Sequence, residues 1–548
     1  MKLFSSCITV CLENKLRRSD LPIVAVERKI CSSVGATSQS TGRSYGATGN
    51  TDNAESIDRS SLTGLLKQTL RALAVLLILL ASIVSPAQTG APPQDAQSVQ
   101  PRRDAHVIMI SIDGLVPDYY TEPARLGLRV TNLTKMKLGG AYADGVEGVF
   151  PTVTYPSHTS LITGVRPATH GIYQNRIFEA PTDPQTEEWY WFAKDLKSET
   201  LWSMAKKAGL VTANVGWPVT AGADIDYSVP EIKDPKEDPA ADKSRARVLQ
   251  YSTPGLLAKA LSKAPSSDTS TDGRRTAISE YIINEYKPNL MLIHLLALDG
   301  AHHTYGPRSP EAIKTAEQMD EYVGRIIEAT RKAGTFDQTT FFLVSDHGFA
   351  SVNKKFEPNV VLVKEKLITL DASGKPTEWK AAAWPAGGSC AIVLRDPNDK
   401  ETASKVTEIF NRMAAKEGGP LNRVLNQAEI KRLGSIPTAL LMLDAGPGFA
   451  FDEKLTGPEI HDSKGYRGTH GHLPSRAELR SALIIYGAGA RVGARMPIAR
   501  MIDIGPTAAA ILGLRFAEAE GSPIAELIKP GLIPPPPPKQ KKKKSSGQ

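Results

Sequence analysis

Three apolar runs of this 548-residue chain each lead into side chains that can bind a metal ion. The run "HVIMISIDG" leads into Asp113, "NLMLIHLLALDGAHH" into Asp299 and then His303, and "TTFFLVSDHGF" into Asp346 and His347. A lone Asp after a strand is more often a turn or helix-cap residue. Carboxylates that gather in one place, however, repel one another unless cations neutralise them, and mixed His/Asp sets suit Zn²⁺. Such endings predict a site for one or two metal ions if the runs share one edge of the fold.

The apolar runs have the pattern of strands in one sheet. Strands are expected over 107–112, 290–298, 340–345 and 481–486, and helices between them, for example over 309–333. Continuous apolar strands separated by helices indicate a mostly parallel sheet that is covered on both faces. Sites in such α/β sheets form beyond the carboxyl ends of the strands. The three endings are therefore expected at one rim, together with His470 from the later segment "GTHGHLPS".

A threonine between the first two endings lies in the segment "GVFPTVTYPSHTSLITGVRPATHGIYQN", residues 148–175. Pro156 can open a helix that runs to about Thr163, which places Thr154 near its start. The N–H groups at a helix N-terminus favour a phosphate or another anion. A threonine hydroxyl is a weak nucleophile unless a base or a metal ion activates it.

Together these motifs resemble the nucleotide pyrophosphatase/phosphodiesterase family of the alkaline phosphatase superfamily. The resemblance covers about residues 106–525, and the matching motifs occur in the family's order. They are Asp113-Gly114, Pro151 to His158, Thr163 to Ile172, Asp299 to Pro307, Ser345 to Gly348 and His470-Gly471. The resemblance implies an alkaline-phosphatase-like α/β fold, with a mostly parallel central sheet, helices on both faces and an inserted lobe near the active site.

The resemblance also implies a role for each matching residue and two Zn²⁺ ions per chain. Thr154 would be the nucleophile and would form a phosphothreonine intermediate, and Asn175 would donate to a phosphoryl oxygen. One zinc ion would be held by Asp113, Thr154, Asp346 and His347, and the other by Asp299, His303 and His470. The implied activity is hydrolysis of a phosphodiester or a pyrophosphate bond, in a small-molecule phosphodiester or nucleotide substrate.

The remaining histidines of these segments have weaker claims to a ligand role. His294 lies inside its strand and is expected to be a core histidine. His302 and His472 are neighbours of proposed ligands, and the motif spacing selects His303 and His470 instead. His158 and His170 are expected to have structural roles.

The segment expected to contact the substrate departs from the nucleotide-hydrolysing relatives. They have a Trp-Pro-Gly-Ser-Asp run, whereas this chain has "GWPVTAGAD" with Trp217-Pro218 kept. Tyr155 and Trp217 are the candidate surfaces for stacking a substrate group, and Trp217 could equally be a core residue. The preference for a nucleotide over another diester stays open.

Two alternative functions follow from the same fold. A phosphomonoesterase would resemble this chain but carry a Lys-x-Arg pair near Trp217, and Lys243-Ser-Arg245 lies further along in a charged segment that we interpret as solvated surface. A non-catalytic binding protein of the same fold would be expected to have lost at least one metal ligand. A sulfatase is disfavoured, because Cys390 lies outside any Cys-x-Pro-x-Arg context.

The two ends of the chain differ from its body. We expect a doubtful leader over 1–60, a signal peptide over 61–87, a linker over 88–105, a catalytic domain over 106–528 with an inserted lobe over 351–469, and a disordered Pro/Lys tail over 529–548. Basic residues, an apolar stretch over 72–84 and the small residues Ser85 to Ala87 favour an exported protein, periplasmic or secreted. An anchor formed by 72–84 is the alternative.

Charge is also concentrated at the ends. The first 87 residues carry about +4 and the tail adds five lysines, so that roughly −1 of the total of +8 is left for residues 88–538. The body therefore shows no sign of a nucleic-acid-binding surface. The Lys-rich tail could make a weak contact with an anionic membrane or cell surface, although a solvated end is the simpler interpretation.

Overall fold

The structure, a computed structural model, describes residues 100–186, 188–232, 242–263 and 268–535. The segments expected to be the leader and the signal peptide, most of the expected linker and the lysine run of the tail lie outside these ranges. Within them, none of the helices combines the length and the apolar character needed to cross a membrane.

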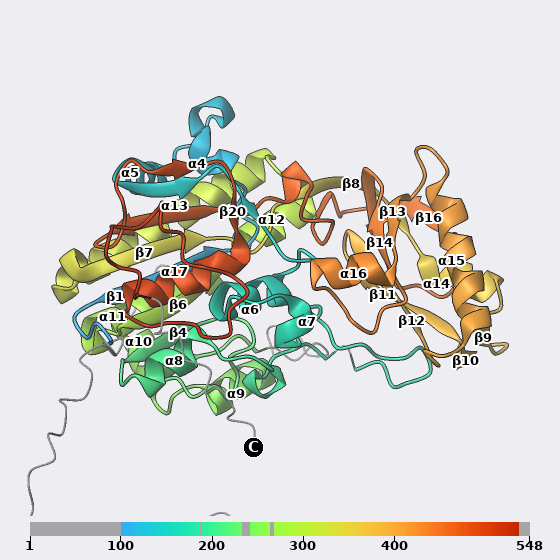
Figure 1. Cartoon of the computed structure of the whole chain (residues 1–548), viewed down its shortest axis with the longest axis horizontal. Helices are drawn as coiled ribbons and strands as arrows, with labels where there is room; N and C mark the ends of the chain where they lie inside the picture. The colour runs from blue at the N-terminus through green and yellow to red at the C-terminus, as the bar shows by residue number, and fades with distance from the viewer. Residues whose placement is uncertain (1–99, 187, 233–241, 264–267, 536–548) are drawn as a thin grey trace, which may run out of the picture. The chain divides into compact units, whose positions relative to one another are not determined.

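An eight-stranded sheet in the order β19-β2-β18-β7-β1-β6-β4-β5 forms the centre of the fold (Figure 1). Strand β1 pairs in parallel with β6 and β7, and β4 pairs in parallel with β6 and β5. Strand β18 is antiparallel to both β7 and β2. The strands are β1 (His106–Ile112), β2 (Gly140–Ala143), β4 (Thr212–Val215), β5 (Tyr227–Val229), β6 (Leu290–Leu295), β7 (Thr339–Val344), β18 (Leu483–Gly487) and β19 (Arg495–Met496). The expected mostly parallel sheet is confirmed.

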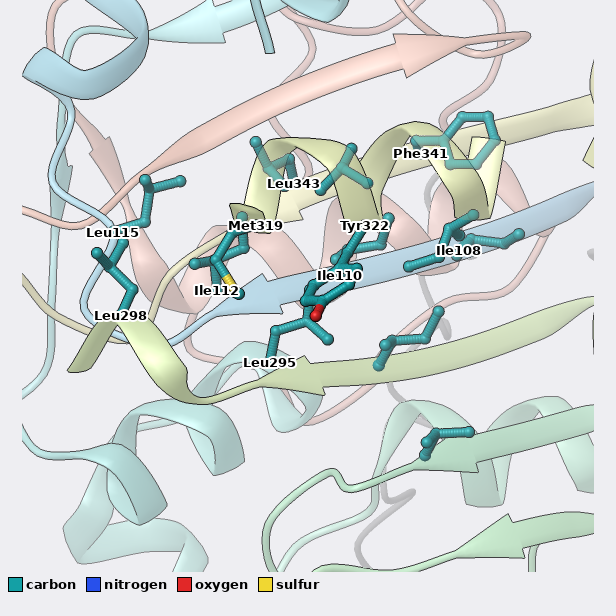
Figure 2. Packing of buried hydrophobic residues seen from close by; sticks show 14 of the residues in the cluster. Ile108, Ile110, Ile112, Leu115, Leu295, Leu298, Met319, Tyr322, Phe341 and Leu343 are labelled. Carbon is teal, nitrogen blue, oxygen red and sulfur yellow. The ribbon is translucent and has the colours of Figure 1, made fainter. Parts of the chain in front are cut away.

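The sequence of strand β1 is continuously apolar because both of its faces are buried. Ile108, Ile110 and Ile112 belong to one hydrophobic cluster, in which Met319 and Tyr322 of a covering helix also lie (Figure 2). Val107 and Met109 point to the opposite face and belong to a second cluster. The helices that contribute to the first cluster include α11 (Thr271–Tyr286) and α13 (Pro310–Ala333), and those of the second include α6 (Thr154–Thr163), α8 (Leu201–Lys207) and α17 (Ile504–Ile511). Both faces of the sheet are covered, so both sets of alternating side chains are buried.

The strand expected over 290–298 is shorter than predicted, because a helix replaces its last residues. Helix α12 (Ala297–Tyr305) starts there, and the Asp272 carboxylate accepts hydrogen bonds of 2.8–3.0 Å from the N–H groups at its start. A carboxylate at this place satisfies N–H groups that a helix leaves without partners. Asp299 therefore lies in the first turn of a helix rather than at a strand end, and His303 follows one turn later on the same side.

The segment after β7 builds sheets and a hydrophobic core of its own (Figure 1). One sheet has the order β11-β12-β14-β13 and another the order β15-β8-β16. The elements are β8 (Ala350–Phe356), α14 (Pro358–Lys364), β9 (Ile368–Leu370), β10 (Pro376–Trp379), β11 (Ala381–Ala386), β12 (Ser389–Leu394), α15 (Lys400–Ala414), β13 (Leu421–Leu425), α16 (Gln427–Leu433), β14 (Leu441–Ala445), β15 (Gly448–Phe451), β16 (Ile460–Asp462) and β17 (Gly468–Thr469). We call residues 350–469 the lobe. Its first strand leaves just after Asp346-His347, and its last strand, β17, pairs with β8 directly before His470.

Candidate metal centre

Asp113, Asp346 and His347 form a first cluster beyond the carboxyl ends of β1 and β7. Their ligand atoms all lie within 4.8 Å of one another, and all three side chains are buried. His347 Nε2 lies 3.1 Å from Asp346 Oδ2 and 3.4 Å from Asp113 Oδ1. The other oxygen of Asp346 accepts hydrogen bonds of 3.1 Å from the N–H groups of Gly114 and His347. These bonds fix the carboxylate so that Oδ2 faces the other ligands.

Asp299, His303 and His470 form a second cluster with the same spacing limit of 4.8 Å. Asp299 Oδ1 lies 3.3 Å from His303 Nε2 and 3.6 Å from His470 Nε2. The rings of His470 and His347 stack with centroids 3.5 Å apart, so the two clusters share a border. The segments that bring these residues together are far apart in the sequence, and His347 and His470 lie just before and just after the lobe.

The three histidines are oriented as metal ligands would be. Nδ1 donates to a backbone carbonyl in each ring: to Gly468 at 2.8 Å from His303, to Thr152 at 3.1 Å from His470, and to Gly348 at 3.2 Å from His347. A carbonyl can only accept, so Nδ1 carries the proton and Nε2 presents its lone pair. Proteins commonly fix metal-binding imidazoles through such a bond on the second nitrogen.

The carboxylates fit a cation as well. Asp113 Oδ1, Asp346 Oδ2 and Asp299 Oδ1 are buried, and among the described residues they have no hydrogen-bond donor. Burial, followed by the charge of Asp346, raises the pKa of Asp113 well above its usual range. Burial and the neighbouring His347 lower the pKa of His470 far below its usual range, which keeps that ring neutral. Imidazoles beside crowded carboxylates are the donor set that Zn²⁺ takes.

Thr154 is the first residue of helix α6 and faces the first cluster. The preceding residue, Val153, has an extended backbone, so the chain turns into the helix at Thr154. Thr154 Oγ1 lies 3.5 Å from His347 Nε2. Asn175 is close by, because its Oδ1 accepts a 2.9 Å hydrogen bond from the N–H of Tyr155. That bond leaves the amide Nδ2 of Asn175 as its outward donor.

A cavity of about 1080 Å³ opens beside these residues. Asn175, His303 and His470 line it, and most of the remaining wall comes from residues 176–185, Trp189 and the lobe. The lobe contacts residues 176–189 directly, since Phe178 packs against the ring of Trp384 with centroids 5.5 Å apart. The cavity is large enough for a substrate group well beyond a phosphate.

Tyr155 and Trp217 do not line this cavity, which corrects their expected role as stacking surfaces. Both are 0% exposed. The rings of Trp189 and Trp191 lie edge-on to Tyr155, with centroids at 5.2 and 5.8 Å. Trp217 belongs to the second hydrophobic cluster and contacts the ring of His158. Trp189 is the aromatic residue of this group that reaches the cavity wall.

The other histidines lie around the centre. His158 Nδ1 donates to the Thr154 carbonyl at 2.8 Å, and its Nε2 lies 2.9 Å from Ser111 Oγ, so His158 holds the first turn of α6. His302 Nε2 lies 3.0 Å from the hydroxyl of Tyr119, turned away from the second cluster. His294 makes contacts that the sequence does not reveal, because one of its nitrogens lies 3.1 Å from Asp113 Oδ2.

Comparison with known proteins agrees with this arrangement. The profile of the family described as type I phosphodiesterase / nucleotide pyrophosphatase matches residues 107–472. The chain belongs to this family. The chain is 24% identical over 254 residues to human ectonucleotide pyrophosphatase/phosphodiesterase family member 1, which is 44% of this chain and 23% of that protein. It is also 24% identical over 290 residues to mouse family member 7, which is 52% of this chain and 56% of that protein.

Solved structures of the family show the same fold. Human ectonucleotide pyrophosphatase/phosphodiesterase 5 matches with a TM-score of 0.55 and 19% identity, over 77% of this chain and 100% of the other. An inactive variant of the murine counterpart, in complex with AMP, matches with a TM-score of 0.54 and 18% identity, over 78% of this chain and 100% of the other. The alkaline-phosphatase-like fold expected from the sequence is confirmed. The match spans less than two thirds of the length of the curated relatives named above.

Proposed function

We propose that this protein is an exported two-zinc hydrolase that cleaves phosphodiester or pyrophosphate bonds through a phosphothreonine at Thr154. The observation that carries the proposal is the pair of bordering clusters, with Thr154 Oγ1 3.5 Å from His347 Nε2. The names of the relatives, which are pyrophosphatases and phosphodiesterases, support the reaction class.

Each cluster would hold one zinc ion. The first ion would be held by Asp113, Thr154, Asp346 and His347, and the second by Asp299, His303 and His470. Bound zinc would supply positive charge that makes the Thr154 hydroxyl easier to deprotonate and stabilises the developing charge on phosphate. The protein's own side chains would set the geometry. The fixed imidazoles and carboxylates would determine where the zinc ions lie relative to Thr154 Oγ1, at one border of the centre.

The reaction would have two steps. Oγ of Thr154 gives up its proton to water and forms a bond to phosphorus while the bond from phosphorus to the leaving oxygen breaks, and the leaving oxygen takes a proton from water, so that no proton is gained or lost overall. Water then attacks the phosphothreonine, which releases the second product and restores the threonine hydroxyl. The phosphoryl group would lie at the N-terminus of helix α6, where the helix dipole favours negative charge. Nδ2 of Asn175 would donate to a non-bridging oxygen.

The surroundings of Thr154 favour a diester over a monoester. A monoester brings two negative charges to the phosphoryl group and a diester only one. Val219, Thr220 and Ala221, which follow Trp217-Pro218, are uncharged and buried, and Asn175 offers a neutral amide. Two cations of the cavity wall already have carboxylate partners, since Arg176 pairs with Glu453 at 3.3 Å and Lys355 with Asp452 at 2.8 Å. The Lys243-Ser-Arg245 segment lies in helix α9 (Asp242–Tyr251), whose first side chains are outside the described part of the chain.

The second ester group would enter the cavity. Its wall offers Trp189 and lobe residues to that group, so the lobe would contribute to binding and not only to the fold. Binding energy from a remote group of this kind is used only by a diester, because a monoester lacks the group.

Rates on bis(4-nitrophenyl) phosphate and 4-nitrophenyl phosphate test the proposal, because both release the same chromophore. Both rates are measured before and after treatment with a chelator, and again after zinc is restored. A metal-dependent diester rate that exceeds the monoester rate supports the proposal. A faster monoester rate would favour the phosphomonoesterase alternative, and no rate on either ester would favour the binding-protein alternative.

The proposed export depends on residues outside the described ranges. N-terminal sequencing of the protein recovered outside the cytoplasm is expected to begin near Gln88, after the small residues Ser85 to Ala87. Recovery of an intact 72–84 segment on a membrane-bound form would support the anchor instead.

A further inference from the structure

Glu231 is a buried carboxylate behind the metal centre for which the proposed reaction gives no role. It follows strand β5 and is 4% exposed. Its Oε1 accepts a 3.0 Å hydrogen bond from the hydroxyl of Tyr155, and its Oε2 accepts a 3.0 Å bond from Arg275. Oε2 also lies 3.2 Å from Nδ1 of His294. A buried carboxylate is costly unless its partners are this well placed.

One branch of this network reaches a proposed metal ligand. His294, in strand β6, is fully buried and lies between two carboxylates: Nδ1 faces Glu231, and Nε2 is 3.1 Å from Asp113 Oδ2. Because the His294 ring contacts Oδ2 of Asp113, Oδ1 is the oxygen of this carboxylate that faces His347. The orientation of His294 thus decides which oxygen of Asp113 is offered to a metal ion.

The other branch reaches the proposed nucleophile. Tyr155 follows Thr154 in the chain and is held at both ends: its N–H donates to Asn175 Oδ1 at 2.9 Å, and its hydroxyl donates to Glu231. The aromatic contacts with Trp189 and Trp191 complete its surroundings. A side chain fixed in this way limits how far the peptide of Thr154 can move.

Arg275 joins the two branches from helix α11. It forms a buried ion pair with Glu231 and donates a second hydrogen bond of 2.8 Å to the carbonyl of His294. Gly216 has a φ of +70°, and a Cβ there would lie 2.5 Å from the Arg275 guanidinium, so the close approach requires a glycine. The guanidinium supplies the positive charge that a carboxylate beside Asp113 needs.

We propose that Glu231 is a positioning residue. Through His294 and Tyr155, it fixes the positions of Asp113 and Thr154 relative to each other. The proposal rests on the proposed function, because it assigns Glu231 a role toward the first zinc ion and the nucleophile. Loss of its charge is expected to loosen both branches, so zinc affinity and kcat fall while KM changes little.

Glu231→Gln tests the proposal in the full-length enzyme. Zinc affinity is measured by competition with a chromogenic chelator, a readout that does not depend on turnover. One of the two zinc ions is expected to bind about 10–100-fold more weakly, with a fall in kcat of similar size. Glu280→Gln is the matched control, because Glu280 lies on the same helix as Arg275 and pairs with Arg325 at 3.0 and 2.8 Å. The control is expected to keep both values.

Tyr155→Phe separates the two branches, since it removes only the hydroxyl that reaches Glu231. It is expected to lower kcat and to leave zinc affinity unchanged. If Glu231→Gln does not fold, zinc affinity in His294→Gln and kcat in Tyr155→Phe decide the matter, and wild-type values for both overturn the proposal. Unchanged zinc affinity in a folded Glu231→Gln overturns it too. A wild-type enzyme that binds fewer than two zinc ions would instead contradict the proposed function.

Discussion

The rim of the central sheet and the lobe both contain clusters of carboxylates and histidines, but the clusters differ in whether lysines neutralise them. The rim of the central sheet holds the clusters Asp113/Asp346/His347 and Asp299/His303/His470, and the lobe holds a third cluster, Glu357/Asp452/His461, with the same spacing limit of 4.8 Å. Each cluster on its own has ligand chemistry that suits a divalent cation. Spacing alone therefore does not separate them.

The partners of the carboxylates do separate them. In the lobe cluster, Lys355 pairs with Asp452 at 2.8 Å, and Lys454 lies 3.5 Å from Glu357. Nζ of Lys454 lies 3.1 Å from His461 Nε2 and can donate to it, which occupies the nitrogen that a metal ion would need. At the rim, three carboxylate oxygens have no donor among the described residues. We infer that the lobe cluster is neutralised by the protein's own cations and that the rim clusters need cations from outside.

The largest expected effect tests the reactive end of the rim. Thr154→Ala removes the hydroxyl that faces His347 but keeps the other three proposed ligands of the first cluster. We expect kcat to fall by about 10⁴-fold or more, as for loss of a nucleophile elsewhere, with close to two zinc ions still bound. Steady-state kinetics and metal analysis of the same preparation check both values. A near wild-type rate would mean that water attacks directly.

The second prediction concerns the metal count at the rim. His303→Ala removes one of the three proposed ligands of the second cluster, and the wild-type protein is expected to hold two zinc ions. We expect the variant to retain close to one zinc ion and to lose at least about 100-fold in kcat/KM, because loss of a direct ligand exceeds the 10–100-fold typical of supporting residues. Metal analysis after gel filtration gives the count. Two zinc ions in the variant would place the second ion elsewhere.

The sequence predicts the rim well because the carboxyl ends of parallel strands meet there. Asp113, Asp346 and His347 follow strands that apolar runs reveal, so their neighbourhood follows from the sheet. The sequence predicts Asp299 as a ligand but wrongly places it at the end of a strand. Helix α12 already starts two residues before Asp299, and the sequence gives no sign that Asp272 accepts hydrogen bonds from the N–H groups at this helix start.

The site residues that the sequence analysis missed or misassigned depend on tertiary contacts, which leave no pattern in the local sequence. The sequence does not reveal Glu231, which lies beyond a three-residue strand and meets Tyr155 and His294 only in the folded chain. The expectation that Tyr155 stacks on the substrate is wrong, because the ring of Trp189 packs against Tyr155 in the folded chain. The sequence gives no sign of this contact. Prediction succeeds where the sheet dictates neighbours and fails where loops bring residues together.

The third prediction is a ratio rather than a loss. Arg176 and Lys355 on the cavity wall are already paired with carboxylates, so neither is spare for the second charge of a monoester. The cavity also offers contacts that only a diester can use. We expect kcat/KM for an aryl phosphodiester to exceed that for the matching monoester by at least about tenfold, or about 1.4 kcal/mol of barrier. A monoester rate equal to or above the diester rate would indicate cationic groups at the site, with Lys243 and Arg245 as the first to substitute.

The smallest expected effect is in the lobe and tests the comparison most directly. His461→Ala removes one possible ligand from the lobe cluster but leaves Lys355 and Lys454 beside the two carboxylates. If those lysines already neutralise the cluster, the zinc count stays at two and kcat/KM changes by less than about twofold, because His461 belongs to neither rim cluster. His303→Ala is the matched histidine variant at the rim, and metal analysis is run on both. A fall to a lower zinc count in His461→Ala would show that the lobe binds a metal ion despite its lysines, and unsatisfied carboxylate oxygens would then no longer separate the two regions.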